Sequence, residues 1–439
     1  MKVKSSGEEP KGYDFAIEEV PASHRKPMVY SLAVWAGLNL VPVAVLTAML
    51  LANSLTFGEF VLVAVIASLS LGLAVGIAGY VGYKTGLSFG LFSRYVFGSV
   101  GFIIPTWLIP LALVGWNAFN LSILALVTQV AFGLPGWTFA ILVIVFMALF
   151  SVSAYYGFLA MAKLSFIYVP IMLLLLFVGV LLSLGKTGGI GGLTAIWPAV
   201  PAMSVAAGIT SIFGIFGLGS GSMSMDIQRW CKNGKDAFLS GFISFIVIFT
   251  FQIVSGGIIG VATKSTDVGV AFAALGIGAV AWLVMFLLTW STSDNDYYSA
   301  SLGIANFFKT KRRDLCVFGV AIAAAIVAIA GIVNYLVPWL TIMAAIGTPI
   351  AGIELADAYY NKLKYPPIKH VLYPKPGKRV VAPVQVSAYI SWIVGSAVML
   401  YTNSIGFGVP PLFGIIIAFV LHLILRRVIK QDIVWPEKA

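Results

Sequence analysis

Charged residues are scarce in this chain. Only 10% of its 439 residues are Asp, Glu, Lys or Arg, whereas 60% are hydrophobic. A soluble domain of this composition would have to bury almost every segment at once, which excludes an ordinary soluble globular protein. Cysteine is nearly absent as well, since the chain contains only Cys231 and Cys316. The sequence therefore predicts no disulfide framework, and no metal-ligand cluster or cofactor is expected.

Long hydrophobic runs are abundant instead. We count twelve runs of about 20 residues, the length that crosses the roughly 30 Å hydrocarbon core of a bilayer. They lie near residues 29–51, 60–82, 102–130, 137–157, 164–184, 203–225, 238–262, 270–297, 315–335, 338–357, 383–402 and 409–427. The first run is too long for a signal-peptide core, so we expect no cleavable signal. The chain is predicted to be an all-α integral membrane protein with 12 transmembrane helices.

The basic residues predict the orientation of these spans. Of the 27 Lys and Arg residues, 25 fall on one side of the twelve-span arrangement, and only Lys186 and Lys264 fall on the other. The positive-inside rule then places both termini in the cytoplasm, with the protein in the cell (plasma) membrane. Cytoplasmic regions would be the tails 1–28 and 428–439 and the loop 358–382. The net charge of +11 is explained by orientation and lipid contact, and we expect no nucleic-acid partner.

Two predicted spans contain residues that interrupt a helix. Residues 214–226 hold four glycines and three serines; each glycine costs about 1 kcal/mol relative to alanine inside a helix. Span 1 contains Asn39 and Pro42, and proline removes a backbone donor. Unwound backbone at membrane depth is tolerated only where it lines a polar cavity or is buried in protein. Each break is thus a candidate half of a binding site, although an ordinary proline kink would also explain the first.

The two breaks lie in spans 1 and 6, five spans apart. That spacing is typical of two inverted repeats of five spans, each opened by a discontinuous helix. We therefore predict a ten-helix transport core over residues 29–357. Its halves would be residues 29–184 and 203–357, and two extra helices would follow over residues 383–427.

Span 3 carries a tryptophan and an amide near its middle. Trp116 and Asn120 are four residues apart and share a helix face. Together they offer a flat π surface and an amide that both donates and accepts hydrogen bonds, which suits a planar, hydrogen-bonding solute. The alternative is structural: Trp116 would pack in the bundle and Asn120 would bond another helix.

Polar and acidic side chains interrupt spans 8 and 10. Ser291 and Thr292 offer hydroxyl oxygens to a cation, while Asp294 and Asp296 are candidate proton carriers because acids at membrane depth mark ion or proton pathways. If span 8 were shorter than drawn, these two aspartates would lie near an interface instead. In span 10, Glu354 and Asp357 are expected to approach the cytoplasmic surface.

Four motifs in order resemble the nucleobase–cation symporter family, which includes cytosine permeases, purine-cytosine permeases and hydantoin transporters. They are the Gly79 to Gly98 loop with Lys84-Thr85-Gly86-Leu87, the pair Gly115-Trp116, Asp226-x-x-Arg229, and Trp290 to Asn295 followed by Ala305-Asn306. The resemblance implies the five-plus-five bundle with two extra helices, alternating access, and a base stacked on Trp116 and hydrogen-bonded by Asn120.

The same resemblance implies a sodium site. Sodium would be held by oxygens of Val41, Ala44, Leu288, Ser291 and Thr292. Further substrate contacts are expected from the amides of Asn39 and Asn295 and from the second break at Phe216, Gly217 and Gly219.

Two positions depart from the family pattern. Leu113 stands where bacterial cytosine permeases have a glutamine, and Gly217 stands where relatives stack a second aromatic ring. Either Phe216 or Phe213 takes the place of that ring, or the second ring wall is absent.

The expected function is a secondary active symporter, not an enzyme. It would import a nucleobase, cytosine or a purine-like planar heterocycle, coupled to sodium or protons, and would work as a monomer. The alternatives are a thiamine precursor, a hydantoin or allantoin, or an amino-acid-like substrate carried by the same fold.

Overall fold

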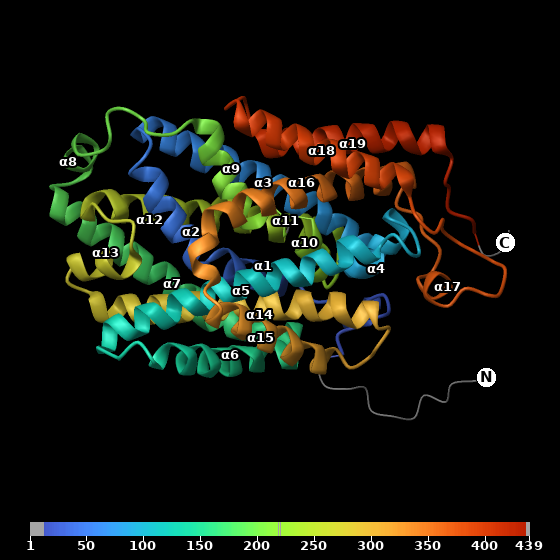
Figure 1. Ribbon diagram of the computed structural model, residues 1–439, viewed down its shortest axis with the longest axis horizontal. Helices are drawn as coiled ribbons and strands as arrows, with labels where there is room; N and C mark the ends of the chain where they lie inside the picture. Colours follow the sequence, from blue (N-terminus) through green and yellow to red (C-terminus); the bar gives the residue numbers. More distant parts are fainter. Residues whose placement is uncertain (1–12, 218, 220, 436–439) are drawn as a thin grey trace.

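The computed structural model describes residues 13–217, 219 and 221–435. These residues form a bundle of helices that run roughly along its longest axis (Figure 1). The described residues contain no β-strand, only an isolated parallel bridge between Lys26 and Cys231. The all-α prediction is confirmed.

The elements follow one another along the chain in a simple order. They are η1 Ala22–His24, α1 Met28–Asn39, α2 Pro42–Ala52, α3 Phe57–Thr85, α4 Phe89–Val96, α5 Ile103–Phe132, α6 Thr138–Tyr156, α7 Phe158–Thr187, α8 Ile190–Ala195, α9 Val205–Phe216, α10 Ser222–Gln228, α11 Gly234–Ile243, the π-helical η2 Ser244–Phe249, α12 Thr250–Thr263, α13 Val268–Ala274, α14 Gly278–Phe307, α15 Arg313–Ile329, η3 Ile332–Tyr335, α16 Leu336–Tyr360, α17 Lys369–Leu372, α18 Val386–Ser404 and α19 Pro410–Ile429.

Within the described ranges, seven helical segments are long and apolar enough to cross a membrane, or eight if the bent pair of α1 and α2 counts as one span. They are α3, α5, α6, α7, the continuous segment Gly234–Thr263, Thr341–Tyr360 of α16, and α19. The remaining predicted spans also coincide with helices, namely α9 with α10, α14, α15 and α18. These are interrupted, shorter or more polar, so the count of twelve stays a prediction.

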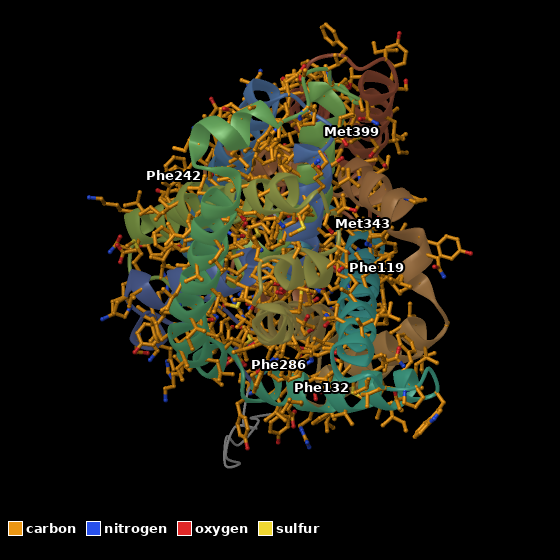
Figure 2. The ribbon with its side chains drawn as sticks, turned by 90° about the vertical axis from the view of Figure 1, so that its left-hand side faces the viewer. Phe119, Phe132, Phe242, Phe286, Met343 and Met399 are labelled. Carbon is orange, nitrogen blue, oxygen red and sulfur yellow. The ribbon has the colours of Figure 1, made fainter. Side chains whose placement is uncertain are left out.

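The outer surface of the bundle is apolar, as a lipid-facing surface must be. On α3, Val65, Leu69, Leu73 and Ile77 recur every fourth residue and are each between 41% and 49% exposed. This spacing places them in one stripe along the helix. Figure 2 views the bundle from the left-hand side of Figure 1 and shows side chains filling the space between the helices.

The predicted span 270–297 is not a single helix. It is divided into α13 and α14 at Gly276, whose φ of +79° is a conformation that favours glycine. Because α14 continues to Phe307, Asp294 and Asp296 lie well inside it, and both are buried.

Residues 13–26, here called the N-terminal segment, are packed against one end of the bundle. The sequence analysis assigns these residues to a tail, yet Tyr13, Ala16 and Val20 are buried. Arg229, beyond the end of α10, donates hydrogen bonds to the carbonyls of Asp14 and Phe15 at 2.7 and 3.0 Å. Buried guanidinium groups need such acceptors, which explains why this polar stretch is held in place.

The N-terminal segment also joins distant elements at that end of the bundle. The Asp14 carboxylate accepts a hydrogen bond from the Phe158 N–H at 2.8 Å, at the start of α7, and lies 3.9 Å from Arg313. Glu19 accepts one from the Ile368 N–H at 2.9 Å, in the loop before α17. In Figure 1 this end carries α4 and α17, while α8 and α13 lie at the opposite end.

Asp14→Ala is expected to destabilise the protein. The substitution removes the acceptor for the first N–H of α7, because residue 157 is a glycine and offers no side-chain cap. Loss of a cap costs about 1 kcal/mol, which corresponds to a melting temperature roughly 2–4 °C lower in detergent.

Glu18→Ala is the matched control for this measurement. Glu18 belongs to the same segment and makes only an exposed ion pair with Lys311 at 3.6 Å, a contact typically worth about 0–1 kcal/mol. Equal melting temperatures for the two variants would contradict the capping role of Asp14.

Candidate functional site

The first break lies between α1 and α2, whose axes meet at 54°. The N–H groups of Val41 and Ala44 donate to the carbonyls of Asn39 and Val41, at 3.0 and 3.1 Å. In a continuous helix they would donate to Gly37 and Leu40. The break therefore releases the carbonyls of Gly37 and Leu40 from the helical pattern.

Ser291 of α14 contacts both released carbonyls. Its hydroxyl oxygen lies 2.8 Å from Gly37 O, 3.3 Å from Leu40 O and 2.9 Å from Leu288 O, so these carbonyls are alternative acceptors for its one proton. The Thr292 hydroxyl donates to Leu288 O at 3.0 Å. Two hydroxyl and three carbonyl oxygens thus converge between α1 and α14, the kind of oxygen set that binds a sodium ion at an unwound helix.

The carbonyls beside Ser291 are not those of Val41 and Ala44, which the resemblance had suggested. Val41 O instead accepts a hydrogen bond from the Gln252 side chain at 2.9 Å, and Ala44 lies inside α2. Gly37 and Leu40 are three residues apart, like Val41 and Ala44, but lie four residues earlier in the chain. The physical reason is that a break releases the carbonyls that precede it.

The second break separates α9 from α10 and is packed closely against α16. A Cβ atom on Gly217 would lie 3.1 Å from Thr348, and one on Gly221 would lie 3.2 Å from Ala351. Both distances are shorter than an ordinary side-chain contact, so a larger residue at either position would require its neighbour on α16 to shift.

Phe216 takes the position facing the cavity, beside Gly219 and Met223. Phe216 packs edge-to-face on Phe245 and Phe249, with both ring-centroid distances 5.2 Å. Phe213 is buried and does not line the cavity. Of the predicted contacts from this break, Phe216 and Gly219 therefore face the cavity and Gly217 faces away.

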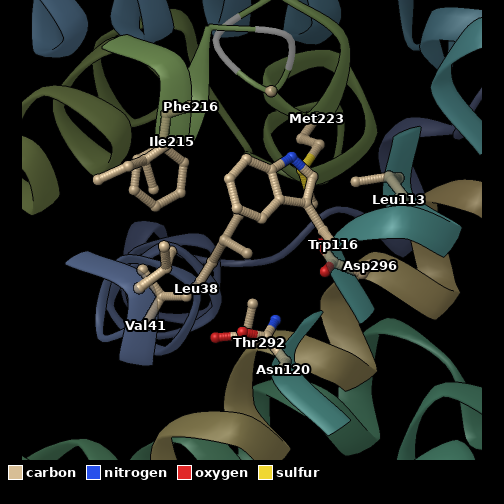
Figure 3. A pocket seen from close by; sticks show the side chains of 12 residues that line it. Leu38, Val41, Leu113, Trp116, Asn120, Ile215, Phe216, Met223, Thr292 and Asp296 are labelled. Carbon is tan, nitrogen blue, oxygen red and sulfur yellow. The ribbon is translucent and has the colours of Figure 1, made fainter. Parts of the chain in front are cut away.

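Both breaks border one cavity between α1, α5, α9 and α14. The volume of this cavity is about 30 Å³. The lining residues are Leu38, Val41, Val43, Leu113, Trp116, Asn120, Ile215, Phe216, Gly219, Met223, Thr292 and Asp296 (Figure 3).

Trp116 and Asn120 of α5 face this cavity together. In Figure 3 the indole of Trp116 projects into the cavity near Phe216, and Asn120 lies beside Thr292. Asn120 is fully buried, and neither its amide nitrogen nor its amide oxygen has a hydrogen-bond partner. Buried amide groups are normally satisfied, so this one is available to a solute with both a donor and an acceptor.

Trp339 of α16 covers Trp116 on another side. The two rings meet edge-to-face with centroids 6.4 Å apart. A Cβ atom on Gly115 would lie 2.3 Å from the Trp339 ring, so glycine at that position lets α16 approach α5. The sequence analysis missed Trp339, because a tryptophan in an apolar run carries no local sign of its partner.

Two predicted substrate contacts lie outside the cavity. Asn39 donates to the Ser244 hydroxyl at 2.9 Å and joins α1 to η2. Asn295 donates to the Ser291 carbonyl at 2.8 Å and to Asp294 at 3.0 Å. Both amides serve contacts between protein groups instead of lining the cavity.

The two candidate proton carriers differ in position. Asp296 lines the cavity, whereas Asp294 is bonded to Asn295 within the same helix. Each has one carboxyl oxygen, Oδ2, that is buried without a hydrogen-bond partner. Within the described ranges neither forms an ion pair.

Most lining residues that the sequence analysis missed are apolar. Leu38, Val43, Ile215 and Met223 are ordinary residues of apolar helices, and only the three-dimensional arrangement brings them to the cavity. Leu113 had been noted as a departure from the family, and it does line the cavity. The wall there is apolar where a glutamine would have offered an amide.

Comparison with known sequences identifies the family. Residues 19–423 match the model for permeases of cytosine/purines, uracil, thiamine and allantoin. The cytosine permease of Escherichia coli is 29% identical over 352 residues, which cover 80% of this chain and 82% of that protein.

Solved structures show the same fold. Mhp1, a nucleobase-cation-symport-1 family transporter, matches with a TM-score of 0.81 in a closed conformation with bromovinylhydantoin bound; the identity is 20%, and the match covers 95% of this chain and 96% of Mhp1. Its inward-facing conformation gives a TM-score of 0.77 at 18% identity, covering 95% and 94%. A sodium-coupled sialic acid symporter matches at 0.65 and 13% identity, covering 95% and 93%. The chain therefore belongs to the family of permeases for cytosine/purines, uracil, thiamine and allantoin, and it is a multi-pass membrane transporter, not an enzyme.

Proposed function

We propose that the protein imports a nucleobase, either cytosine or a purine-like heterocycle, by alternating access. The base stacks on Trp116, with Phe216 on another side of the cavity, and hydrogen-bonds to Asn120. The observation that carries the proposal is the Asn120 amide, which is buried beside an indole with both of its polar atoms unpartnered. A planar solute with adjacent donor and acceptor satisfies both atoms, and each unsatisfied buried group otherwise costs about 1–3 kcal/mol.

Related heterocycles are the second candidate class. The relative Mhp1 has a hydantoin bound, and the matching family includes permeases for thiamine and allantoin. Leu113 removes one polar group from the cavity wall, which favours a substrate that makes few hydrogen bonds on that side. Binding of purified protein to cytosine, adenine, uracil, allantoin and a hydantoin, compared by thermal shift, distinguishes these substrates. An amino acid serves as the negative comparison.

The proposed membrane arrangement follows the two breaks. Twelve spans are arranged as two inverted repeats, residues 29–184 and 203–357, with the helices of residues 383–427 added. The bent pair α1 and α2 and the interrupted pair α9 and α10 support this arrangement, since each leads one half and both border the cavity. The end with the N-terminal segment faces the cytoplasm of the cell membrane, and one chain supplies all of the lining residues, so a monomer suffices.

The proposed coupling ion is sodium, held between α1 and α14. Its ligands are the carbonyl oxygens of Gly37, Leu40 and Leu288 and the hydroxyl oxygens of Ser291 and Thr292. The fit rests on the two carbonyls that the first break releases. When bound, sodium supplies the positive charge at this break. Coupling by protons at Asp294 or Asp296 is the alternative, which the unpartnered carboxyl oxygens of both residues support.

Trp116→Ala is expected to abolish high-affinity substrate binding. Stacking of a base on an aromatic side chain is worth about 1–3 kcal/mol, which corresponds to roughly 5- to 150-fold in affinity. Equilibrium binding of radiolabelled cytosine to purified protein measures the loss. Trp107→Ala is the matched control, since Trp107 lies on the same helix and packs on Phe307 outside the cavity. Near-normal affinity of the Trp116 variant would sink the stacking model.

Asn120→Leu separates recognition from stability. The variant should bind the same probe about 10- to 100-fold more weakly, because a hydrogen-bonded polar pair is lost. Its ligand-free melting temperature should be unchanged or higher, because two unsatisfied buried atoms are removed. Asn117→Leu is the control; Asn117 donates to Leu113 O at 3.2 Å and does not line the cavity. A loss of stability without a loss of affinity would assign Asn120 a purely structural role.

Ser291→Ala combined with Thr292→Ala is expected to remove the stimulation of substrate binding by sodium. Binding measured with and without sodium at constant ionic strength gives the comparison. Ser293→Ala is the control, since this buried serine makes none of the contacts to the released carbonyls. Uptake that needs no sodium but follows a proton gradient, and that Asp296→Asn or Asp294→Asn removes, would establish the proton alternative instead.

A further inference from the structure

Glu354 of α16 is a fully buried acid, and neither of its carboxyl oxygens has a hydrogen-bond partner. It forms no ion pair within the described ranges. Asp357, three residues later, is equally buried but lies 3.4 Å from Arg426 and 3.6 Å from His422 and accepts a hydrogen bond from Tyr365. Both acids are thus covered by other parts of the protein. Of the two, Glu354 is the one that the surrounding protein leaves uncompensated.

Glu354 lies directly behind the wall of the substrate cavity. Gly219 and Met223 line the cavity. Gly221, between them in sequence, faces α16 instead, and a Cβ atom there would lie 3.0 Å from Glu354 Oε2. The unwound backbone of the second break thus separates the cavity from this carboxyl group.

Among the described residues, the helices around α16 present only one charged group to Glu354. That group is Asp226 of α10, another acid, which accepts a hydrogen bond from Phe89 N–H at 2.9 Å. On α19, His422 and Arg426 are directed to Asp357.

The other neighbouring elements supply no counter-charge. On α4, Arg94 bonds Asn306 and Tyr95 bonds Pro366 O. On α18, Tyr389 bonds Gly101 O. On α3, Tyr80 and Lys84 interact with each other, and α9 contains no titratable residue. None of these groups therefore neutralises Glu354.

An ionised Glu354 in this packed arrangement is strongly unfavourable, because a buried charge needs a counter-charge or hydrogen bonds. A metal ion would require several further oxygen ligands. The close approach of Gly221 and Ala351 leaves little room for them. A proton needs no additional ligand, so the neutral acid is the form that fits.

We propose that Glu354 is a proton-binding residue of the transport cycle, neutral while α10 is packed against α16 and ionised when the two separate. The proposal rests on the proposed function only in taking the second break as a part that moves. On separation, the carboxyl O–H gives its proton to water that enters beside Gly221. On closure the carboxylate takes a proton back, so each opening and closing is linked to one proton. Transport would then depend on the pH at the side from which α10 becomes accessible.

Cys231 provides a built-in reporter of this opening. It follows α10 by three residues, is fully buried, and donates to the Ser31 hydroxyl of α1 at 3.2 Å. Burial raises the pKa of the Cys231 thiol to about 11. Below that pH the thiolate fraction of Cys231 therefore rises about tenfold per pH unit. Because this rise is the same in both variants, it cancels when their modification rates are compared at one pH. Cys316, the half-exposed cysteine, is removed as Cys316→Ser.

The experiment compares modification of Cys231 by N-ethylmaleimide in Cys316→Ser protein with and without Glu354→Gln. The expected ratio of the two rates is near one at pH 5 and about tenfold in favour of the Glu354 protein at pH 9, since only that protein gains an ionised state that favours opening. Glu18→Gln, an exposed acid at the same end of the bundle, should follow the Glu354 protein. A ratio that stays constant with pH overturns the proposal. So does an opening at high pH that Asp226→Asn abolishes and Glu354→Gln leaves unchanged.

A second measurement uses the unmutated protein, in case Glu354→Gln does not fold. Dicyclohexylcarbodiimide, which reacts with protonated carboxyl groups in apolar surroundings, should modify Glu354 at pH 5 and progressively less as the pH rises, as read by peptide mass spectrometry. Absence of modification at every pH contradicts the proposal. Neither measurement uses a nucleobase, so a failure here is distinct from a failure of the proposed substrate.

Discussion

Backbone hydrogen bonding at membrane depth is the constraint on which this structure depends. A helix that stops inside the bundle releases carbonyl and N–H groups, and these groups must find partners because no bulk water is available. At the first break the partners are the Ser291 hydroxyl and the Gln252 amide, contributed by α14 and α12. The positions of three helices are thereby tied to a single interruption between Asn39 and Pro42. The cavity exists where these helices and the second break meet.

The long helix α16 packs both against Trp116, which lines the cavity, and against the second break. Its Trp339 lies over Trp116, its Thr348 packs on Gly217, and its Ala351 and Glu354 pack on Gly221. Glycines at positions 115, 217 and 221 permit this approach. As a result, α16 contacts both Trp116 and the unwound backbone of the second break. A displacement of α16 would change the two together, which suits a transporter that must open and close around one site.

The two breaks were predictable from sequence because their signals are local. Glycine and proline act through their own chemistry, and the structure has α1 ending at Asn39 and α9 ending at Phe216. Trp116 and Asn120 were predictable to the extent that two residues four apart share a helix face. The ring that packs on Trp116 was not, because Trp339 reaches it from a helix more than two hundred residues away.

Other errors arose where side-chain direction is set by neighbouring helices. Asn39 lies beside the first break and Asn295 lies four residues after Ser291, yet the side chains of both form hydrogen bonds to other protein groups. The expected sodium ligands Val41 and Ala44 lie four residues after Gly37 and Leu40, whose carbonyls contact Ser291. The sequence does not show on which side of Val41 the helix is interrupted. The N-terminal segment was taken for a tail because its composition is polar, and its acceptors for Arg229 are backbone carbonyls, which composition does not reveal.

The N-terminal segment also imposes an order on assembly during synthesis. Asp14 leaves the ribosome well before Phe158, Arg229 and Arg313, the residues that it and its carbonyl contact. This segment can therefore take its final place only after α7, α10 and α15 have been inserted. Its carbonyls then accept hydrogen bonds from Arg229, and its Asp14 carboxylate pairs with the buried Arg313.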